Sequence, residues 1–240
     1  MSSAEQLNKF RSIINGSKHA VFFGGAGVST ESGIPDFRSQ DGIYSRKYAY
    51  PPEYILSATF FRTHTAEFFD FYRDKMVYPG AKPNAAHIKL AQWEREGRLS
   101  AVITQNIDGL HQAAGSRNVL ELHGSVWRNY CTRCRRSYQA DYVLNCAGVP
   151  ECECGGTVKP DVVLYEEQLN GDTLERAVRF IRNADTLIVG GTSLNVYPAA
   201  GLVDFFSGGN LVVINKGEAA RTLSGALVID APIAEFFSAV

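Results

Sequence analysis

Seven short runs of apolar residues recur along the chain, each bounded by glycine or polar residues: 19–23, 101–104, 119–122, 162–165, 186–189, 211–214 and 227–229. Continuous rather than alternating apolar runs are typical of parallel strands that are buried on both faces. Helical patterns lie between many of these runs: 58–76, 84–96, 173–183, 198–206 and 233–240. Strands that alternate with helices predict an α/β fold with a doubly wound parallel sheet.

Two stretches depart from this rhythm. Residues 39–83 hold two helical patterns and no convincing strand, and residues 126–159 carry close pairs of cysteines. We therefore predict one large α/β domain made of residues 1–38, 84–125 and 160–240. A smaller composite domain would combine the helical insertion 39–83 with the cysteine module 126–159.

The cysteine module has the spacing of a zinc ribbon. Cys131 and Cys134 form one close pair, Cys152 and Cys154 form another, and seventeen residues separate the pairs. Zn²⁺ takes four thiolates in a tetrahedron, and two short turns with a pair on each supply them. Two disulfides or ordinary core thiols are the alternative. We expect structural zinc, with the fifth cysteine, Cys146, as a reduced and partly buried thiol.

Composition and charge narrow the classes of partner. The chain has 240 residues and a net charge of −1, and no long stripe of lysine or arginine suggests a nucleic-acid surface. No run approaches the roughly 20 apolar residues that cross a bilayer. The first residues show neither the charged region nor the apolar core of a secretory signal, so we expect a cytoplasmic location. The oligomeric state stays open.

Glycine turns follow two of the predicted strands. Gly24, Gly25 and Gly27 come directly after the first strand, and Gly190 and Gly191 end a later one. Glycine there lets the backbone approach a pyrophosphate, although the spacing misses the standard dinucleotide fingerprint. Alone, either turn could be a tight turn without a ligand. Asn215 ends a third strand and could bond ribose hydroxyls or cap a helix. Together the three strand ends predict nucleotide binding.

Polar clusters follow the same strand ends. They are Gly33-Ile-Pro-Asp-Phe-Arg38, Thr104-Gln-Asn-Ile-Asp108 and His123-Gly124. Ligands of open α/β sheets bind outside the carboxyl ends of the strands, so these clusters should share one crevice. A lone histidine at a strand end is usually structural. One beside glutamine, asparagine and aspartate in a cofactor cleft is a candidate general base.

These motifs resemble the signatures of the sirtuins. The similarity includes Gly25-Ala-Gly-Val-Ser29, the three polar clusters, the cysteine pairs, Gly191-Thr-Ser-Leu-Asn-Val-Tyr-Pro198 and Val213-Ile-Asn215, and it runs from about residue 19 to about residue 230. Around residues 35–44 and 165–167 the chain looks more like the bacterial class U branch than like the eukaryotic branches. The resemblance implies a Rossmann-like domain joined to a small domain of helical and zinc-ribbon parts.

The resemblance also implies the chemistry. Sirtuins consume NAD as a co-substrate: the acyl oxygen of a modified lysine attacks the nicotinamide ribose, nicotinamide leaves, and lysine and O-acetyl-ADP-ribose result. His123 would be the catalytic base, and Asn106 and Asp108 would orient the ribose and the nicotinamide amide. The other positions that would contact NAD are Gly25, Ala26, Thr30, Phe37, Arg38, Gln105, Ile107, Gly191, Thr192, Ser193, Asn215, Lys216 and Asp230.

The substrate would be an acetyl-lysine protein or peptide. In the family an extended peptide pairs with two chain segments, which here are Val162, Val163, Leu164 and Tyr165, and Leu194, Asn195 and Val196. Main-chain pairing gives affinity with little sequence selectivity. Glu166 replaces the glycine that is common in the family, so we expect an altered turn and a carboxylate that favours basic peptides.

The choice of acyl group rests on a second alignment. Relatives that remove succinyl or malonyl groups carry Tyr-x-x-Arg in the helix that lines the acyl pocket, and Phe69 and Tyr72 align with those places. An acidic acyl group would lack a cationic partner, and burying an unpaired charge is costly. We therefore expect neutral acyl groups, acetyl first. Arg73 lies one residue from the aligned position, so a shifted alignment would reverse this expectation.

Other functions remain as alternatives. An ADP-ribosyltransferase would share the first half of the reaction, and a deacylase for longer neutral acyl groups would share all of it. A dehydrogenase also uses a Rossmann-like glycine loop, but no hydride site is evident. A binding adaptor would have no need of the intact Asn106, Asp108 and His123.

Overall fold

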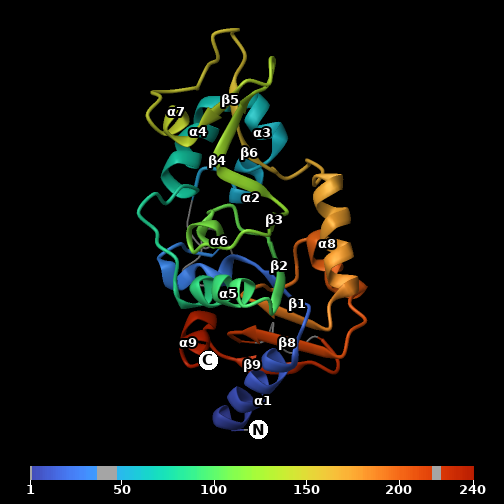
Figure 1. Ribbon diagram of the computed structural model, residues 1–240. Helices are drawn as coiled ribbons and strands as arrows, with labels where there is room; N and C mark the ends of the chain where they lie inside the picture. Colours follow the sequence, from blue (N-terminus) through green and yellow to red (C-terminus); the bar gives the residue numbers. More distant parts are fainter. Residues whose placement is uncertain (1, 37–47, 218–222) are drawn as a thin grey trace.

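The computed structural model describes residues 2–36, 48–217 and 223–240. Within them a parallel sheet of six strands has the order β3-β2-β1-β7-β8-β9 (Figure 1). Its strands are β1 (Ala20–Gly24), β2 (Leu99–Thr104), β3 (Val119–Glu121), β7 (Thr186–Gly190), β8 (Asn210–Asn215) and β9 (Leu227–Asp230). The chain runs outward from β1 to β3 and later restarts at β7 on the other side of β1. The predicted doubly wound sheet is therefore confirmed, and its switch point lies between β1 and β7.

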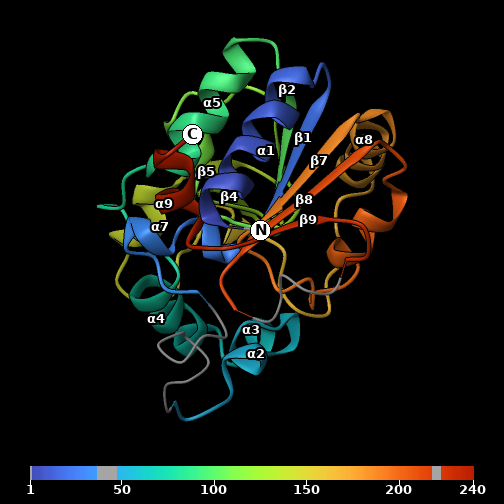
Figure 2. The same cartoon turned by 90° about the horizontal axis from the view of Figure 1, so that it is seen from below.

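Helices cover both faces of this sheet (Figure 2). One face carries α1 (Ser3–Gly16), α5 (Ala85–Arg95) and α9 (Ile233–Ser238), and the other carries α8 (Gly171–Asn183) and the 3₁₀ helix η4 (Ala199–Phe205). The short helices η1 (Ala26–Val28), η2 (Thr30–Ser32) and α6 (Leu110–Ala113) follow β1 and β2. This arrangement leaves the carboxyl ends of the strands open between the layers.

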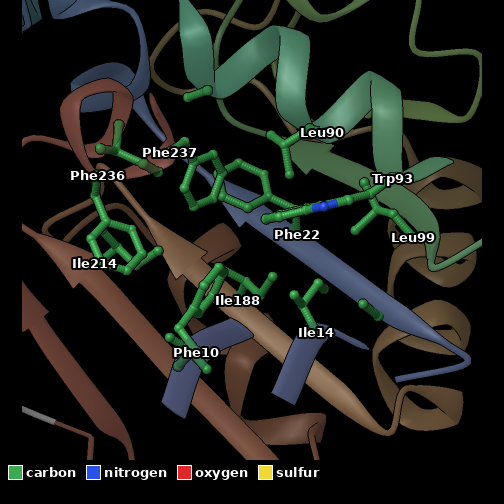
Figure 3. Close-up of a cluster of buried hydrophobic side chains, with 14 of the residues drawn as sticks. Phe10, Ile14, Phe22, Leu90, Trp93, Leu99, Ile188, Ile214, Phe236 and Phe237 are labelled. Atoms are coloured by element: carbon green, nitrogen blue, oxygen red, sulfur yellow. The ribbon is translucent and has the colours of Figure 1, made fainter. Parts of the chain in front are cut away.

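Aromatic side chains fasten α1, α5 and α9 to the sheet (Figure 3). The ring of Phe10 lies 5.2 Å from that of Phe236 and 5.8 Å from that of Trp93, and Phe237 lies 5.2 Å from Trp93. Phe10 and Phe237 are fully buried. Full burial of a phenylalanine side chain stabilises a fold by about 1.5–3 kcal/mol, so this cluster holds the two ends of the chain against the sheet.

A second, antiparallel sheet lies beyond the carboxyl ends of the large sheet (Figure 1). It has the order β5-β4-β6, from β4 (Gly124–Cys131), β5 (Ser137–Gln139) and β6 (Val158–Val162). The helices α2 (Pro52–Ile55), α3 (Ala58–Thr63), α4 (Thr65–Lys75) and α7 (Ala140–Leu144) surround it. Phe60 and Phe68 of the helical insertion share one buried cluster with Val126, Val143 and Val158, so the two insertions pack as one unit.

Several predicted elements need correction. The predicted strand at 162–165 is wrong: β6 ends at Val162 and joins the small antiparallel sheet. The next residues are extended, but Val163 and Tyr165 donate their amides to His123 and Leu56 rather than to a sheet. The predicted helix 58–76 is two helices, because the backbone leaves helical geometry at His64. The element predicted at 198–206 is a 3₁₀ helix.

Among the described α-helices, α1, α6 and α7 were not predicted. Ser2 caps α1 in a capping box with Glu5, in which each side chain bonds the other residue's amide. A serine followed three residues later by a glutamate is the sequence pattern that indicates the start of this helix. The predicted domain boundaries stay a prediction, and β6 spans the boundary at residue 160. Among the described helices, none combines the length and the apolar character that a membrane span needs.

Candidate active site

A cavity of about 480 Å³ opens between the two units, at the carboxyl ends of the parallel strands. Most predicted site positions line it: Ala26, Gln105, Asn106, Ile107, Asp108, His123, Val162, Val163, Leu164, Tyr165, Gly191, Thr192, Ser193, Val196, Asn215 and Lys216. The structure therefore brings the polar clusters of the sequence into one place.

The two glycine turns lie against each other at the floor of this cavity. Gly24 and Gly190 are partners across β1 and β7, and the Gly27 amide donates to the Gly191 carbonyl at 2.8 Å. A Cβ atom on Gly27 would lie 2.8 Å from the Gly191 Cα, so only glycine permits this approach. The side-chain amide of Asn215 donates to the Thr192 carbonyl at 2.9 Å and holds the second turn in place.

A buried hydroxyl joins two of the predicted catalytic residues. Ser29, which is 1% exposed, donates its hydroxyl to Asp108 Oδ2 at 2.7 Å and accepts from Asn106 Nδ2 at 3.1 Å. Asp108 Oδ1 accepts the Leu110 amide at 2.9 Å. Burial raises the pKa of Asp108, while the Leu110 amide and the Ser29 hydroxyl oppose that rise. Ser29 thus orients both side chains, and after the Leu110 amide it opposes the rise of the Asp108 pKa.

His123 has one defined tautomer. Its Nδ1 lies 2.9 Å from the Gln105 carbonyl oxygen. A carbonyl can only accept, so Nδ1 carries the proton and Nε2 keeps a lone pair. Burial lowers the pKa of His123 below its ordinary value, and the bond to Gln105 opposes this. The imidazole is therefore neutral and able to accept a proton at neutral pH.

The residue after His123 must be glycine. Gly124 has φ +77°, and a Cβ atom there would lie 1.9 Å from the Asp161 carbonyl oxygen. This close contact forms where β4 leaves the turn beside β6. The His-Gly motif therefore fixes the direction of the chain behind the base.

Trp127 supports the opposite wall. Its indole nitrogen donates to the Asp108 carbonyl at 2.6 Å, and the Val126 amide donates to the Ile107 carbonyl at 3.0 Å. The side chain is 37% exposed and lines the cavity. These two bonds fasten the 106–108 loop to β4.

The extended segment after β6 lies along the cavity. The Val163 amide donates to the His123 carbonyl at 3.0 Å, and the Tyr165 amide donates to the Leu56 carbonyl at 2.9 Å. The Ala58 amide donates back to the Tyr165 carbonyl at 3.0 Å. The segment thus connects the catalytic turn with the helical insertion.

Glu166 keeps the turn that glycine would form. Its φ is +73°, the left-handed conformation. Its carboxylate accepts the Thr59 amide at 2.9 Å and the Thr59 hydroxyl at 2.7 Å. The Thr59 hydroxyl, then the Thr59 amide, lower the pKa of Glu166. The backbone of Glu166 therefore has a conformation that favours glycine, and its carboxylate caps the first turn of α3.

Other predicted positions lie outside the cavity lining. Gly25, Thr30, Leu194, Asn195 and Asp230 are not among the described residues that line it. Asp230 accepts the Gly217 amide at 2.9 Å, Thr30 donates to the Gly27 carbonyl at 3.1 Å, and Leu194 packs against the α8 face of the sheet. Phe37 and Arg38 lie outside the described residues.

The alignment of the acyl pocket stays a prediction, and the structure places its residues away from the cavity lining. Phe69 and Tyr72 are buried in the core of the small unit and do not line the cavity. Arg73 donates to the carbonyls of Val143 and Gly148, so its guanidinium faces the cysteine module. In this insertion Leu56 lines the cavity before these residues, and Lys75, Met76 and Tyr78 line it after them.

The four paired cysteines form the predicted metal site. Their Sγ atoms all lie within 4.8 Å of one another. Cys131 and Cys154 are 3.5 Å apart, and Cys134 and Cys152 are 3.6 Å apart. Tetrahedral thiolates about 2.3 Å from zinc would be about 3.8 Å apart, whereas a disulfide is about 2 Å long. The Cys134 amide lowers the pKa of Cys131, and the Cys154 amide lowers that of Cys152 to about 6.

The set therefore fits a closed structural zinc site. None of the four cysteines lines the cavity. Cys146 is a free, half-buried thiol, as expected.

The comparisons agree with this geometry. A family model described as the Sir2 family matches residues 25–198. An NAD-dependent protein deacetylase of Clostridium acetobutylicum is 54% identical over 240 residues and covers 98% of both chains.

Two solved structures are similar over nearly the whole chain. A Sir2 histidine-to-alanine variant with a deacetylated p53 peptide and 3′-O-acetyl-ADP-ribose has a TM-score of 0.89 and 40% identity, covering 98% of this chain and 96% of that one. A Sir2 complex with p53 peptide and NAD⁺ has a TM-score of 0.85 and 40% identity, covering 97% and 95%. The motifs, the doubly wound sheet and these matches lead to one conclusion: the chain belongs to the Sir2 family, the sirtuins.

Proposed function

We propose that the chain is an NAD-dependent protein-lysine deacetylase, which transfers the acetyl group of acetyl-lysine to ADP-ribose with release of nicotinamide. The observation that carries this proposal is the shared cavity. A histidine with a free Nε2 and a bonded Ser29–Asn106–Asp108 cluster line it between two glycine turns. The relatives named as deacetylases support the same reaction.

The residues present fit NAD, which supplies the ribosyl bond that the reaction breaks. The close contact of Gly27 with Gly191 brings the two glycine turns together at the carboxyl ends of the strands, where α/β folds of this kind bind a pyrophosphate. Gln105 Nε2 is buried without a partner among the described residues, although Gln105 lines the cavity. A ribose oxygen would satisfy this donor. Asn215 and Lys216 line the end of the cavity proposed for the adenosine.

His123 is the proposed base. Its Nε2 lone pair accepts a proton from a ribose hydroxyl, while the Gln105 carbonyl holds Nδ1–H and stabilises the imidazolium that forms. Asn106 and Asp108 orient the nicotinamide ribose and the carboxamide respectively, and Ile107 provides an apolar wall. An apolar wall keeps water away from a ribosyl centre that develops positive charge.

The acetyl-lysine peptide is proposed to lie along the 162–165 segment. The Val163 carbonyl accepts no hydrogen bond from any residue in the described part of the chain, so it is available to a peptide. Val196 and Ser193 line the other side of the cavity. Because Glu166 is held by Thr59, its carboxylate caps a helix first and attracts a basic peptide only secondarily.

Neutral acyl groups remain the proposed substrates, acetyl first. Arg73 is bonded to the cysteine module, and the ammonium of Lys75, which lines the cavity, lies 2.6 Å from Asp74. An acidic acyl group would have to compete with that carboxylate. Comparable rates on succinyl-lysine and acetyl-lysine peptides would contradict this preference.

The zinc site is proposed to hold the small unit together and to take no part in the reaction. Four thiolates need reduced cysteines, which supports the cytoplasm as the proposed location. Assignment to the class U branch and the domain boundaries given above are likewise proposals.

Mass spectrometry of an acetyl-lysine peptide tests the function. We expect loss of the acetyl group only when NAD is present, with one nicotinamide released per peptide. The His123→Ala variant should bind NAD but leave the peptide acetylated. Transfer of ADP-ribose mass to the protein or peptide, with the acetyl group retained, would instead identify an ADP-ribosyltransferase.

A further inference from the structure

A buried lysine lies beneath the segment that lines the cavity. Lys159 of β6 is 5% exposed. Its Nζ donates to the Val162 carbonyl at 2.8 Å and lies 3.4 Å from the Pro160 carbonyl. It also forms an ion pair with Glu167 at 3.0 Å. An ammonium buried without partners is costly, so these contacts explain how the charge is tolerated.

Glu167 closes the arrangement from the other end. The carboxylate oxygen that meets Lys159 also accepts the Leu164 amide at 2.8 Å, and the Glu167 amide donates to the Leu164 carbonyl at 3.0 Å. Lys159 therefore holds Val162 while Glu167 holds Leu164. Val163, between them, keeps a carbonyl that no described residue bonds.

We propose that Lys159 and Glu167 are positioning residues for the peptide substrate. Their ion pair fixes residues 162–164 as a preformed strand and presents the Val163 carbonyl to the peptide. A preformed edge binds more tightly because less conformational freedom is lost on binding. This inference rests on the proposed function and deepens it, because it assigns two residues outside the reaction chemistry to substrate affinity.

A purely structural ion pair would behave differently. Its loss would lower the melting temperature and the fraction of active enzyme, so kcat would fall and both KM values would stay the same. Loss of a positioning pair raises the KM of the peptide while the KM of NAD stays the same, because the glycine turns lie on other strands. The two readings are thus separated by kinetics rather than by stability.

The variants are Lys159→Met, which keeps the length of the side chain without its charge, Lys159→Arg, and Glu167→Gln. Arg98→Met is the matched control, because it breaks the Arg98–Glu96 pair of 3.3 Å away from the cavity. Steady-state rates are measured against an acetyl-lysine peptide and against NAD, with thermal unfolding of each variant.

We expect the peptide KM to rise about tenfold in Lys159→Met and Glu167→Gln, which corresponds to about 1.4 kcal/mol. Lys159→Arg keeps the charge, so its peptide KM should stay close to the wild-type value. In all three variants the KM of NAD should stay within about twofold of the wild-type value. The double variant should be no worse than either single one, because both remove the same pair. If Lys159→Met does not fold, the peptide KM of Glu167→Gln tests the proposal. The Glu167 side chain is 31% exposed, so its substitution disturbs the core less.

Two kinds of failure are distinguishable. A wild-type enzyme that leaves the peptide acetylated in the presence of NAD overturns the proposed function, and this inference with it. An active wild-type enzyme whose peptide KM is unchanged in Glu167→Gln, or rises together with that of NAD, overturns the positioning role alone.

Discussion

The hydroxyl of Ser29 is the sharpest test of how the cavity works. Ser29→Ala removes one oxygen atom from a fully buried position and adds no bulk. The substitution removes the hydrogen bond that Ser29 donates to Asp108 Oδ2 and the one that it accepts from Asn106 Nδ2. The loop stays bonded, because Asp108 keeps the Leu110 amide and the backbone amide of Asn106 keeps the Thr104 hydroxyl, while the Asn106 side chain loses its bond to Ser29.

The magnitude follows from the two bonds. A hydrogen bond to a charged group contributes about 1.5–3 kcal/mol, and a neutral one about 0.5–1.5 kcal/mol. The loss is therefore about 3 kcal/mol, or roughly a hundredfold in kcat/KM for NAD if it falls on the transition state. The pKa of Asp108 should rise further, because one of the two groups that oppose its burial is gone.

The assay is initial-rate kinetics of nicotinamide release between pH 5 and pH 9, with thermal unfolding in parallel. Loss of activity on the acid side should begin at a higher pH in Ser29→Ala than in the wild type. The control is Ser238→Ala on α9, which also removes a bonded serine hydroxyl but one outside the cavity. An Ser29→Ala enzyme with wild-type kcat/KM and an unchanged pH profile would refute the reasoning.

Three further predictions concern other parts of the molecule. Trp127→Phe keeps an aromatic ring but loses the indole N–H that donates to the Asp108 carbonyl. For a hydrogen bond of about 1 kcal/mol, the KM of NAD should rise about fivefold while the peptide KM stays the same. Equal changes in both KM values would contradict this prediction. Burial lowers the pKa of His87 to about 4. Between pH 6.5 and pH 4 this histidine is therefore protonated in the unfolded chain but neutral in the folded one, so the folded state loses stability as the pH falls through this range. That loss is on the order of 3 kcal/mol, and His87→Gln, which can still serve the capping box, should flatten urea-unfolding stability over this window. Removal of zinc by a chelator should lower the melting temperature and expose four more reactive thiols; an unchanged melting temperature would contradict a structural metal.

The sequence predicted the cavity residues that lie at strand ends, because that rule needs only the strands and their direction. Asn106, His123 and Thr192 are such positions. It gave no role to Ser29, although that residue stands in the first glycine motif. The reason is that its partner Asp108 lies 79 residues away, and only the fold brings them together.

The errors have a common physical cause. The pattern of apolar residues predicts which residues are buried, but it does not predict which elements they pack against. Phe69 and Tyr72 fill the core of the small unit, and their pattern alone does not distinguish a core from a pocket wall. The break at His64 changes the phase of the helix before them, and no proline or glycine marks it. The 162–165 run is not a strand of the large sheet, because Val162 ends β6 beside β4 and Tyr165 forms only an isolated bridge with Ser57.

The main-chain bond between Val163 and His123 has a consequence for how this scaffold can diversify. The side chain of His123 is the proposed base, and its carbonyl accepts the amide of the segment proposed to receive the substrate, so this one residue fixes how the two are placed relative to each other. Backbone bonds do not depend on side-chain identity. Selectivity can therefore drift through substitutions along this segment without misaligning the base. Glu166 is an example, because its backbone has the left-handed conformation that favours glycine while its carboxylate bonds Thr59.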